Sequence, residues 1–346
     1  MSNEPLIPNT MRAHLFTSTS PTLEANLTLN PTAPLPKHAK SLAPNQSLVR
    51  VLATAINPAD YKFPSFPLIG RLLVARPSAP GIDFAGRVTT SGAGHLFKDG
   101  TIVFGRLLKP QKHGTLGEYV VASDAEVVPL PQDVDPGDAA CLGTAATTMY
   151  QCIVPHVKRG DSVFINGGSG GTGTFGIQIA KQMGCWVATT CSEANVGLCR
   201  ELGADEVIDY RKDPVVDRLK GTGKKFQLVV DNVGLDPDIW GRVQEYTSEG
   251  AKFVQVGLPV SVWGMMSLLK SDLLPTWLGA PKRRFLMHNV GTDTKILTHL
   301  GRWLQEGKIK VVKDRVYPYE EAKQAFSQLR AGRSRGKIVI QGLTEV

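Results

Sequence analysis

The chain has 346 residues, which is long for one hydrophobic core and predicts about two domains. Its apolar fraction of 42% is that of a globular protein and argues against a disordered chain. No segment resembles a signal peptide and no apolar run is long enough to span a bilayer, so we expect a cytoplasmic protein. The net charge of +8 has no basic stripe interleaved with aromatics, and we expect no nucleic-acid partner.

The five cysteines are an odd number without a C-x-x-C pair, which argues against a disulfide framework and a structural zinc site. A catalytic zinc needs three protein ligands. No cysteine precedes Cys141, and the histidines before it are not spaced as i, i+4 pairs. We therefore expect no metal.

The first part of the chain is typical of a mostly-β domain. Residues 11–16 and 47–56 have strand patterns, the proline-bearing residues 31–44 between them predict a loop, and short strands with turns continue to about Pro131. A helix with an apolar face is expected over residues 138–156.

Strand and helix patterns then alternate, which is typical of a doubly wound parallel sheet. Strands are predicted near residues 162–166, 186–190, 206–209, 226–231 and 252–256. The apolar residues 260–278 interrupt the pattern. They are compatible with a substrate-pocket wall, a subunit contact or core packing. The tail predicts helix 295–305, strand 314–317, helix 320–329 and strand 337–341.

A glycine-rich turn separates the strand at 162–166 from the next helix. Gly168, Gly170 and Gly173 satisfy G-x-G-x-x-G in the strand–turn–helix context that the dinucleotide fingerprint requires. Residues without Cβ let the backbone approach a pyrophosphate, and the N–H groups of the helix start then face its oxygens. A glycine-rich turn in another α/β protein is the alternative.

The tip of the second strand bears on the choice of nicotinamide cofactor. An NAD site places a carboxylate there, about 20 residues after the glycines, whereas this chain has Ser192. A small hydroxyl residue leaves room for a 2′-phosphate and favours NADPH over NADH. Glu193 is one position further, and Asn195 occupies a position where a Lys or Arg would bind the 2′-phosphate. NADH is therefore the alternative cofactor.

Several motifs together resemble the zinc-free medium-chain dehydrogenases/reductases, in the quinone oxidoreductase and enoyl reductase branch. They extend over nearly the whole chain: Asn57-Pro58-x-Asp60-x-Lys62, Pro80-Gly81-x-Asp83-Phe84-Ala85-Gly86, Gly117-Glu118-Tyr119, the helix 145–150, the glycine turn, Leu202-Gly203-Ala204-Asp205, Val230-Asp231-Asn232-Val233-Gly234 and Gly336-Lys337-Ile338-Val339-Ile340. Zinc-dependent relatives have a Cys and a Gly-His-Glu stretch where this chain has Asn57 and residues 80–83.

The resemblance implies an α/β protein with a GroES-like mostly-β catalytic domain, residues 1–135 and 290–346, and a Rossmann domain, residues 136–289. It implies a substrate cleft between them and either a monomer or a homodimer. Cofactor contacts are implied for Thr147, Gly168, Ser169, Gly170, Gly171, Thr172, Gly173, Ser192, Tyr210, Asn232, Val256 and Gly257.

By the same resemblance, Asn57, Tyr61 and Lys62 are the candidate catalytic residues at the nicotinamide end of the cleft. Lys62 or Tyr61 would stabilise an enolate or hydroquinone oxygen and relay a proton. Each has a structural alternative: Asn57 and Asp60 as turn residues, Tyr61 as packing and Lys62 as a surface charge.

Three functions remain open. The first is hydride transfer from NADPH to a small electrophile, either a quinone or the C=C bond of an α,β-unsaturated carbonyl. The second is a trans-acting enoyl reductase of a polyketide or other secondary-metabolite pathway, for which a basic rim at residues 282–284 would suit an acidic acyl carrier protein. The third is an NADPH-binding sensor or scaffold without turnover.

Overall fold

The computed structural model describes residues 7–66, 70, 72, 74–94, 96–234, 236–256 and 283–342. The chain forms two compact units. One contains the chain through Thr147, Gly291–Gly307 and the chain from Lys313 onward, and the other contains Thr148–Val290 and Lys308–Val312. The first is the GroES-like unit and the second is the Rossmann unit.

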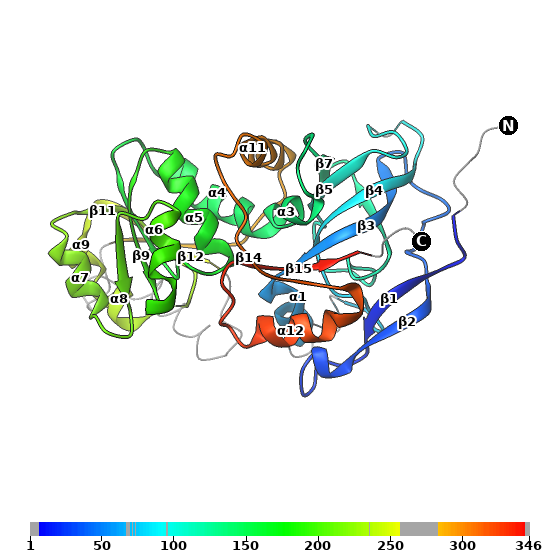
Figure 1. Ribbon diagram of the computed structural model, residues 1–346, viewed down its shortest axis with the longest axis horizontal. Helices are drawn as coiled ribbons and strands as arrows, with labels where there is room; N and C mark the ends of the chain where they lie inside the picture. Colours follow the sequence, from blue (N-terminus) through cyan, green and yellow to red (C-terminus); the bar gives the residue numbers. More distant parts are fainter. Residues whose placement is uncertain are drawn as a thin grey trace. The chain divides into compact units, whose positions relative to one another are not determined.

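The GroES-like unit is built on a sheet with the strand order β14-β15-β3-β4-β5-β7 (Figure 1). Strand β6 also pairs with β3. The strands of this sheet are β3 Gln46–Ile56, β4 Asp83–Ser91, β5 Ile102–Arg106, β6 Tyr119–Ser123, β7 Val127–Pro129, β14 Lys313–Tyr317 and β15 Lys337–Gln341. Strand β15 from the end of the chain pairs antiparallel with β3, and Ile338 lies opposite Ile56. This pairing brings the end of the chain to the residues that precede helix α1.

A separate two-stranded sheet pairs β1 Thr10–Phe16 with β2 Leu27–Pro34. The prediction of a loop from residue 31 is therefore wrong for residues 31–34. Two prolines are tolerated there because, within the described residues, β2 pairs with β1 alone, and an edge strand can lack N–H donors on its free side.

The α-helices in the described part of the GroES-like unit are α1 Pro58–Lys62, α3 Pro136–Ala140, α11 Thr294–Gln305 and α12 Ala322–Arg330. The first two are short, and the last two are longer. Helix α12 packs Ala322, Ala325 and Phe326 into a buried cluster with Phe16 and Ile338. This cluster joins both ends of the chain in one core.

The helix predicted over residues 138–156 is not continuous. Helix α3 gives way to a π-helix, Leu142–Ala146, and then to α4 Thr147–Ile153. The backbone N–H of Thr144 donates to Asp83 Oδ2 at 2.9 Å, and its hydroxyl donates to Asp83 Oδ1 at 2.6 Å. The Asp83 side chain of strand β4 therefore binds the π-helix at Thr144.

The Rossmann unit contains a sheet with the strand order β10-β9-β8-β11-β12-β13, and each adjacent pair is parallel. Its strands are β8 Ser162–Asn166, β9 Trp186–Cys191, β10 Glu206–Asp209, β11 Phe226–Asp231, β12 Thr247–Val256 and β13 Arg284–His288. The five predicted strands are confirmed. β12 begins earlier than expected, and β13 was not predicted.

Helices accompany these parallel strands (Figure 1). They are α5 Gly171–Gln182, α6 Val196–Glu201, α7 Val215–Gly221, α8 Pro237–Gly241 and α9 Val243–Tyr246. Phe164, Phe226 and Tyr246 meet edge to face with ring centroids 6.2 Å apart. The parallel strand order with intervening helices is the predicted doubly wound arrangement, in which the carboxyl ends of the strands lie along one edge.

Candidate functional site

The glycine turn between β8 and α5 is held by hydrogen bonds to Thr190 of strand β9. Gly167 has φ +85°, its N–H donates to Thr190 Oγ1 at 2.8 Å, and the N–H of Gly168 donates to the Thr190 carbonyl at 2.8 Å. Helix α5 then begins after Gly170, and no side chain of a described residue caps its start. The first N–H groups of a helix lack intrahelical acceptors, so this helix start can bind an anion.

Two of the glycines are required by close packing. A Cβ on Gly168 would lie 2.1 Å from Thr189 Oγ1, and a Cβ on Gly173 would lie 2.1 Å from the Gly167 carbonyl oxygen. At Gly170, in contrast, the nearest atom to such a Cβ is 3.7 Å away. The turn is thus packed tightly on the protein side and open at Gly170, an arrangement that fits a pyrophosphate.

Buried oxygen atoms without donors lie at the carboxyl ends of β11 and β12. Asp231 Oδ2, Asn232 Oδ1 and Gln255 Oε1 accept no hydrogen bond from any described residue. Burial raises the pKa of Asp231. Acceptors in this position fit the hydroxyl groups of a dinucleotide ribose, because ligands of parallel sheets bind at the carboxyl ends.

Asn232 and Val256 follow or end these strands, so the structure brings both near the edge that carries the glycine turn. Asn232 Nδ2 donates to the carbonyl oxygen of Asn166, the last residue of β8, at 3.2 Å. The Val256 carbonyl accepts from Gln255 Nε2 at 3.4 Å. Gly257, residues 260–278 and Lys282 lie outside the described residues.

The end of β9 joins the glycine turn through Asn195. Asn195 Nδ2 lies 3.3 Å from both Ser169 Oγ and Ser192 Oγ. The neighbouring carboxylate of Glu193 is paired with Lys212, and this hydrogen bond raises the pKa of the lysine. Because the Glu193 carboxylate is already paired, Ser192 is the residue at the end of β9 whose small, partly buried side chain could face a cofactor.

Tyr210 follows strand β10 and has 52% of its surface exposed. The guanidinium of Arg211 lies 5.7 Å from the centroid of its ring. An aromatic ring with an adjacent cation beside the β9 tip is suited to an adenine or a phosphate.

Asn57 lies in the GroES-like unit, at the start of helix α1, where it is buried. Its Oδ1 accepts from Lys337 Nζ at 2.5 Å, and its Nδ2 donates to Asp83 Oδ2 at 2.8 Å and to the Ala55 carbonyl at 3.2 Å. Both N–H bonds of the amide are thus used within this unit. The geometry suits a residue that positions the helix.

Asp60 is buried one turn further along α1. Its Oδ2 accepts from the backbone N–H of Asn57 at 2.7 Å, while Oδ1 accepts no hydrogen bond from a described residue. Burial, with the charge of Asp83 nearby, raises the pKa of Asp60 to about 7. Its charge therefore changes near neutral pH.

Tyr61 is half-buried and packs against the cluster of Phe16 and Ile338. The guanidinium of Arg330 lies 4.2 Å from its ring centroid and is paired with Glu24 at 2.5 Å. Burial raises the pKa of the tyrosine hydroxyl. These contacts hold the ring firmly in the core of the GroES-like unit.

Lys62 is the last residue of helix α1, and unlike Asn57 and Asp60 its side chain has no hydrogen-bond partner among the described residues. Its amino group makes no hydrogen bond or ion pair with any described residue, and partial burial lowers its pKa. An ammonium group without a counter-ion is available to an oxygen atom that gains negative charge.

Thr147 is fully buried at the start of α4, and its hydroxyl donates to the Leu142 carbonyl at 3.2 Å.

Most of the other predicted site residues form two groups. Asn57, Tyr61 and Lys62 share helix α1 and its first flank, whereas the glycine turn, Ser192, Asn232 and Val256 share one edge of the Rossmann sheet.

Sequence reasoning missed the partners of Asn57, above all Lys337. A signal was present, because Lys337 is followed directly by the apolar residues 338–340 of its strand, and a lysine buried there must find a partner. The network continues from Asp83 through Thr144 to Arg106 Nε, which donates to Thr144 Oγ1 at 3.0 Å.

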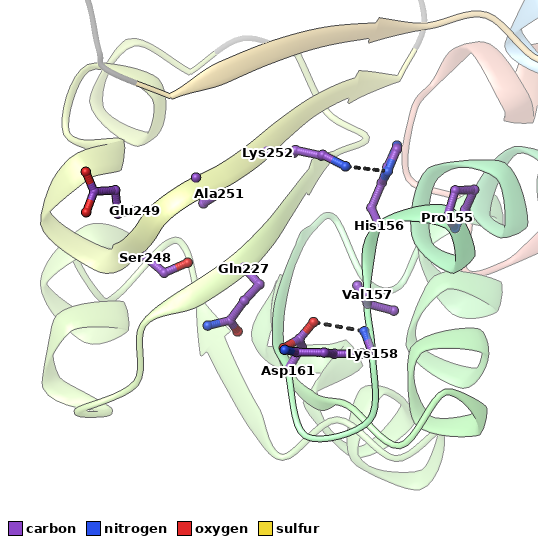
Figure 2. Close-up of a pocket in the computed structure, with 11 residues that line it drawn as sticks. Pro155, His156, Val157, Lys158, Asp161, Gln227, Ser248, Glu249, Ala251 and Lys252 are labelled. Atoms are coloured by element: carbon purple, nitrogen blue, oxygen red, sulfur yellow. Dashed lines mark hydrogen bonds between the residues drawn. The ribbon is translucent and has the colours of Figure 1, made fainter.

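A separate hollow of about 370 Å³ lies at the opposite, amino-terminal ends of β11 and β12. Figure 2 shows Lys252 and His156 pointing toward one another, and Lys252 Nζ donates to His156 Nδ1 at 3.0 Å. Burial, reinforced by the charge of Lys252, lowers the pKa of His156. The hollow is thus at the wrong end of the sheet for the dinucleotide.

Among the described residues, no group of three or more His, Cys, Asp or Glu side chains could hold a metal ion. Within the same residues, none of the helices is long and apolar enough to span a bilayer.

Two protein families match this chain. Residues 43–132 match the alcohol dehydrogenase GroES-like domain, and residues 202–340 match the family described as zinc-binding dehydrogenase.

Relatives match over nearly the whole chain. The trans-enoyl reductase pgmF of Aspergillus terreus is 46% identical over 97% of this chain and 97% of its own. A chloroplastic quinone-oxidoreductase homolog of Spinacia oleracea is 28% identical over 88% of this chain and 93% of its own. The structure of the quinone oxidoreductase from Coxiella burnetii has a TM-score of 0.81 and 29% identity, and the match covers 96% of this chain and 99% of that one.

Proposed function

Because the chain belongs to the medium-chain dehydrogenase/reductase superfamily and is an oxidoreductase with a Rossmann unit for a nicotinamide cofactor, we propose that it is an NADPH-dependent enoyl reductase. Its substrate would be an α,β-unsaturated acyl thioester, presented in trans by the acyl carrier protein of a polyketide pathway.

The similarity to the trans-enoyl reductase pgmF carries this proposal. Its 46% identity extends over 97% of both chains, against 28% for the quinone-oxidoreductase homolog. This ordering reverses the preference that the sequence alone gave to a stand-alone quinone or enone reductase. The relationship to oxidoreductases over nearly the full length also disfavours a sensor or scaffold without turnover.

The Rossmann unit would hold the cofactor through its glycine turn. The backbone of residues 168–173 would bind the pyrophosphate. The oxygens of Asp231 and Asn232 that accept from no described residue would accept from ribose hydroxyls. Ser192, Asn195 and Tyr210 would surround the adenosine 2′-phosphate. When bound, NADPH supplies the hydride for the β-carbon of the enoyl group.

Lys62 would act on the thioester carbonyl. As the C=C bond is reduced, its electron pair moves toward the carbonyl oxygen and leaves an enolate. The Lys62 ammonium, which has no partner among the described residues, would donate a hydrogen bond to that oxygen. Protonation at the α-carbon completes the saturated thioester, with solvent or Tyr61 as the source of the proton. Asn57 would position α1 and not touch the substrate.

Turnover with three electrophiles tests the reaction. We expect oxidation of NADPH with a crotonyl thioester of N-acetylcysteamine at a higher kcat/KM than with a quinone or a cyclic enone. A quinone that is reduced faster than the thioester would favour the stand-alone reductase instead.

The Ser192→Asp variant tests the choice of cofactor. A carboxylate at this tip would repel a 2′-phosphate, so we expect at least about a tenfold weaker Kd for NADPH, equal to about 1.4 kcal/mol. The Kd for NADH, measured by the same calorimetry, should be unchanged or improved. Equal weakening of both cofactors would contradict the assignment of Ser192.

A further inference from the structure

Lys337 is a buried cation, with 3% of its surface exposed, at the beginning of the strand that ends the described chain. Its Nζ donates to the carbonyl oxygen of Ile56 at 3.0 Å and to Asn57 Oδ1 at 2.5 Å. A buried ammonium group is costly unless hydrogen bonds and opposite charge compensate it. The geometry therefore commits Lys337 to the two residues that precede helix α1.

The Asn57 side chain links Lys337 to the carboxylate of Asp83. Its amide lies between Lys337 and Asp83, with the oxygen toward the cation and the nitrogen toward the carboxylate. Asp83 is itself fully buried and held by the hydroxyl and the N–H of Thr144. The Asn57 side chain consequently has one orientation that satisfies all of its partners.

Asn57 is also the residue before the first turn of α1, the five-residue helix that ends at Lys62. Its backbone N–H is held by Asp60 Oδ2 at 2.7 Å. So short a helix has little intrinsic stability and takes its direction from contacts at its ends. The contacts that hold Asn57 therefore determine the position of the Lys62 Cα at the other end of helix α1.

We propose that Lys337 is a positioning residue for the reduction: through Asn57, it fixes helix α1 so that the Lys62 ammonium meets the substrate oxygen. This inference rests on the proposed role of Lys62. A displacement of about 1 Å at a catalytic group can cost on the order of a hundredfold in rate. Loss of the Lys337 amino group should thus affect turnover more than cofactor binding, because the glycine turn belongs to the other unit.

A double-mutant cycle with Lys337→Met and Lys62→Met tests the inference. We expect each single variant to lower kcat for the crotonyl thioester by roughly 10- to 100-fold. If Lys337 acts through Lys62, the double variant should be no slower than Lys62→Met alone. The Kd for NADPH should stay within about twofold in all three, by the same reasoning of separate units.

Lys313→Met is the matched control. Lys313 pairs in register with Lys337 on strand β14, but its amino group contacts Asp138 at 2.8 Å and not α1. We expect an unchanged kcat. If Lys337→Met does not fold, as judged by circular dichroism, Asp83→Asn replaces it in the cycle with the same expectation.

Three results would overturn the inference. Multiplicative losses in the double variant would mean that Lys337 acts independently of Lys62. Full activity in Lys337→Met would mean that α1 needs no such anchor. Full activity in Lys62→Met would reject the proposed role of Lys62 together with this inference, whereas absence of thioester reduction in the unmodified protein would reject the proposed function itself.

Discussion

The amino group of Lys62 is half-buried and has no acidic partner among the described residues, so burial alone lowers its pKa. The proposed reaction needs the protonated amine, since only the ammonium form carries the positive charge that stabilises an enolate. A lysine in this environment loses its proton at a lower pH than an ordinary lysine.

We therefore predict that kcat for the crotonyl thioester falls as pH rises through this lowered pKa. Lys62→Met should lose this alkaline limb and, at neutral pH, roughly 10²-fold in kcat, the usual cost of removing an oxyanion donor. Steady-state kinetics over a pH series would measure both effects. An unchanged profile in the variant would assign the limb to another group.

Asp60 presents the opposite situation, a carboxyl group that burial keeps protonated up to a pKa of about 7. Its folded-state pKa is higher than its unfolded value, so the folded state binds more protons between about pH 4 and pH 7. Ionisation of Asp60 thus reduces the stability of the folded state as pH rises through this range.

We predict that Asp60→Asn removes this effect, because the amide can still accept from the Asn57 N–H. The free energy of unfolding of the unmodified protein should fall relative to that of the variant by more than about 1.4 kcal/mol, one pKa unit, between pH 4 and pH 8. Urea denaturation at several pH values would measure the difference. A constant difference would show that Asp60 does not titrate in this range.

At the scale of elements, the glycine turn shows how packing of the β8–α5 junction prepares a phosphate site. Gly173 lies so close to the Gly167 carbonyl that a Cβ would reach within 2.1 Å of its oxygen, and backbone cannot easily move away. Gly197 in helix α6 has open space in the same position.

Gly173→Ala should accordingly destabilise the protein by about 1–3 kcal/mol and abolish measurable cofactor binding, because the helix start must move away from the turn. Gly197→Ala should be neutral or stabilising by up to about 1 kcal/mol, since alanine favours a helix. Thermal unfolding with and without NADPH would compare the two. Similar behaviour of both variants would contradict the packing argument.

The sequence predicted the parallel strands β8 to β12, though not β13, because each contains a short apolar run bounded by turns, which is a local signal. It failed where a distant residue decides the local structure. Asp83 holds Thr144 at the π-helix, and Lys337 lies far in sequence from Asn57 although the two side chains touch. No local pattern around Asn57 could reveal that its amide is already occupied.

At the scale of the whole molecule, the two units carry separable parts of the proposed chemistry. The Rossmann unit carries the glycine turn and the β9 tip, and the GroES-like unit carries Lys62 and its supporting network. Substitutions at Ser192 and at Lys62 should therefore affect different kinetic constants, cofactor affinity in the first case and kcat in the second.

The enoyl reductase reaction can be tested by following a labelled hydride into a carrier-bound substrate. The purified protein would be incubated with deuterated NADPH and a crotonyl group on the pantetheine arm of an acyl carrier protein, and the acyl group analysed by mass spectrometry. We expect a saturated acyl chain with one deuterium on the β-carbon. An acyl chain that remains unsaturated, while the same protein oxidises NADPH with a quinone, would contradict it.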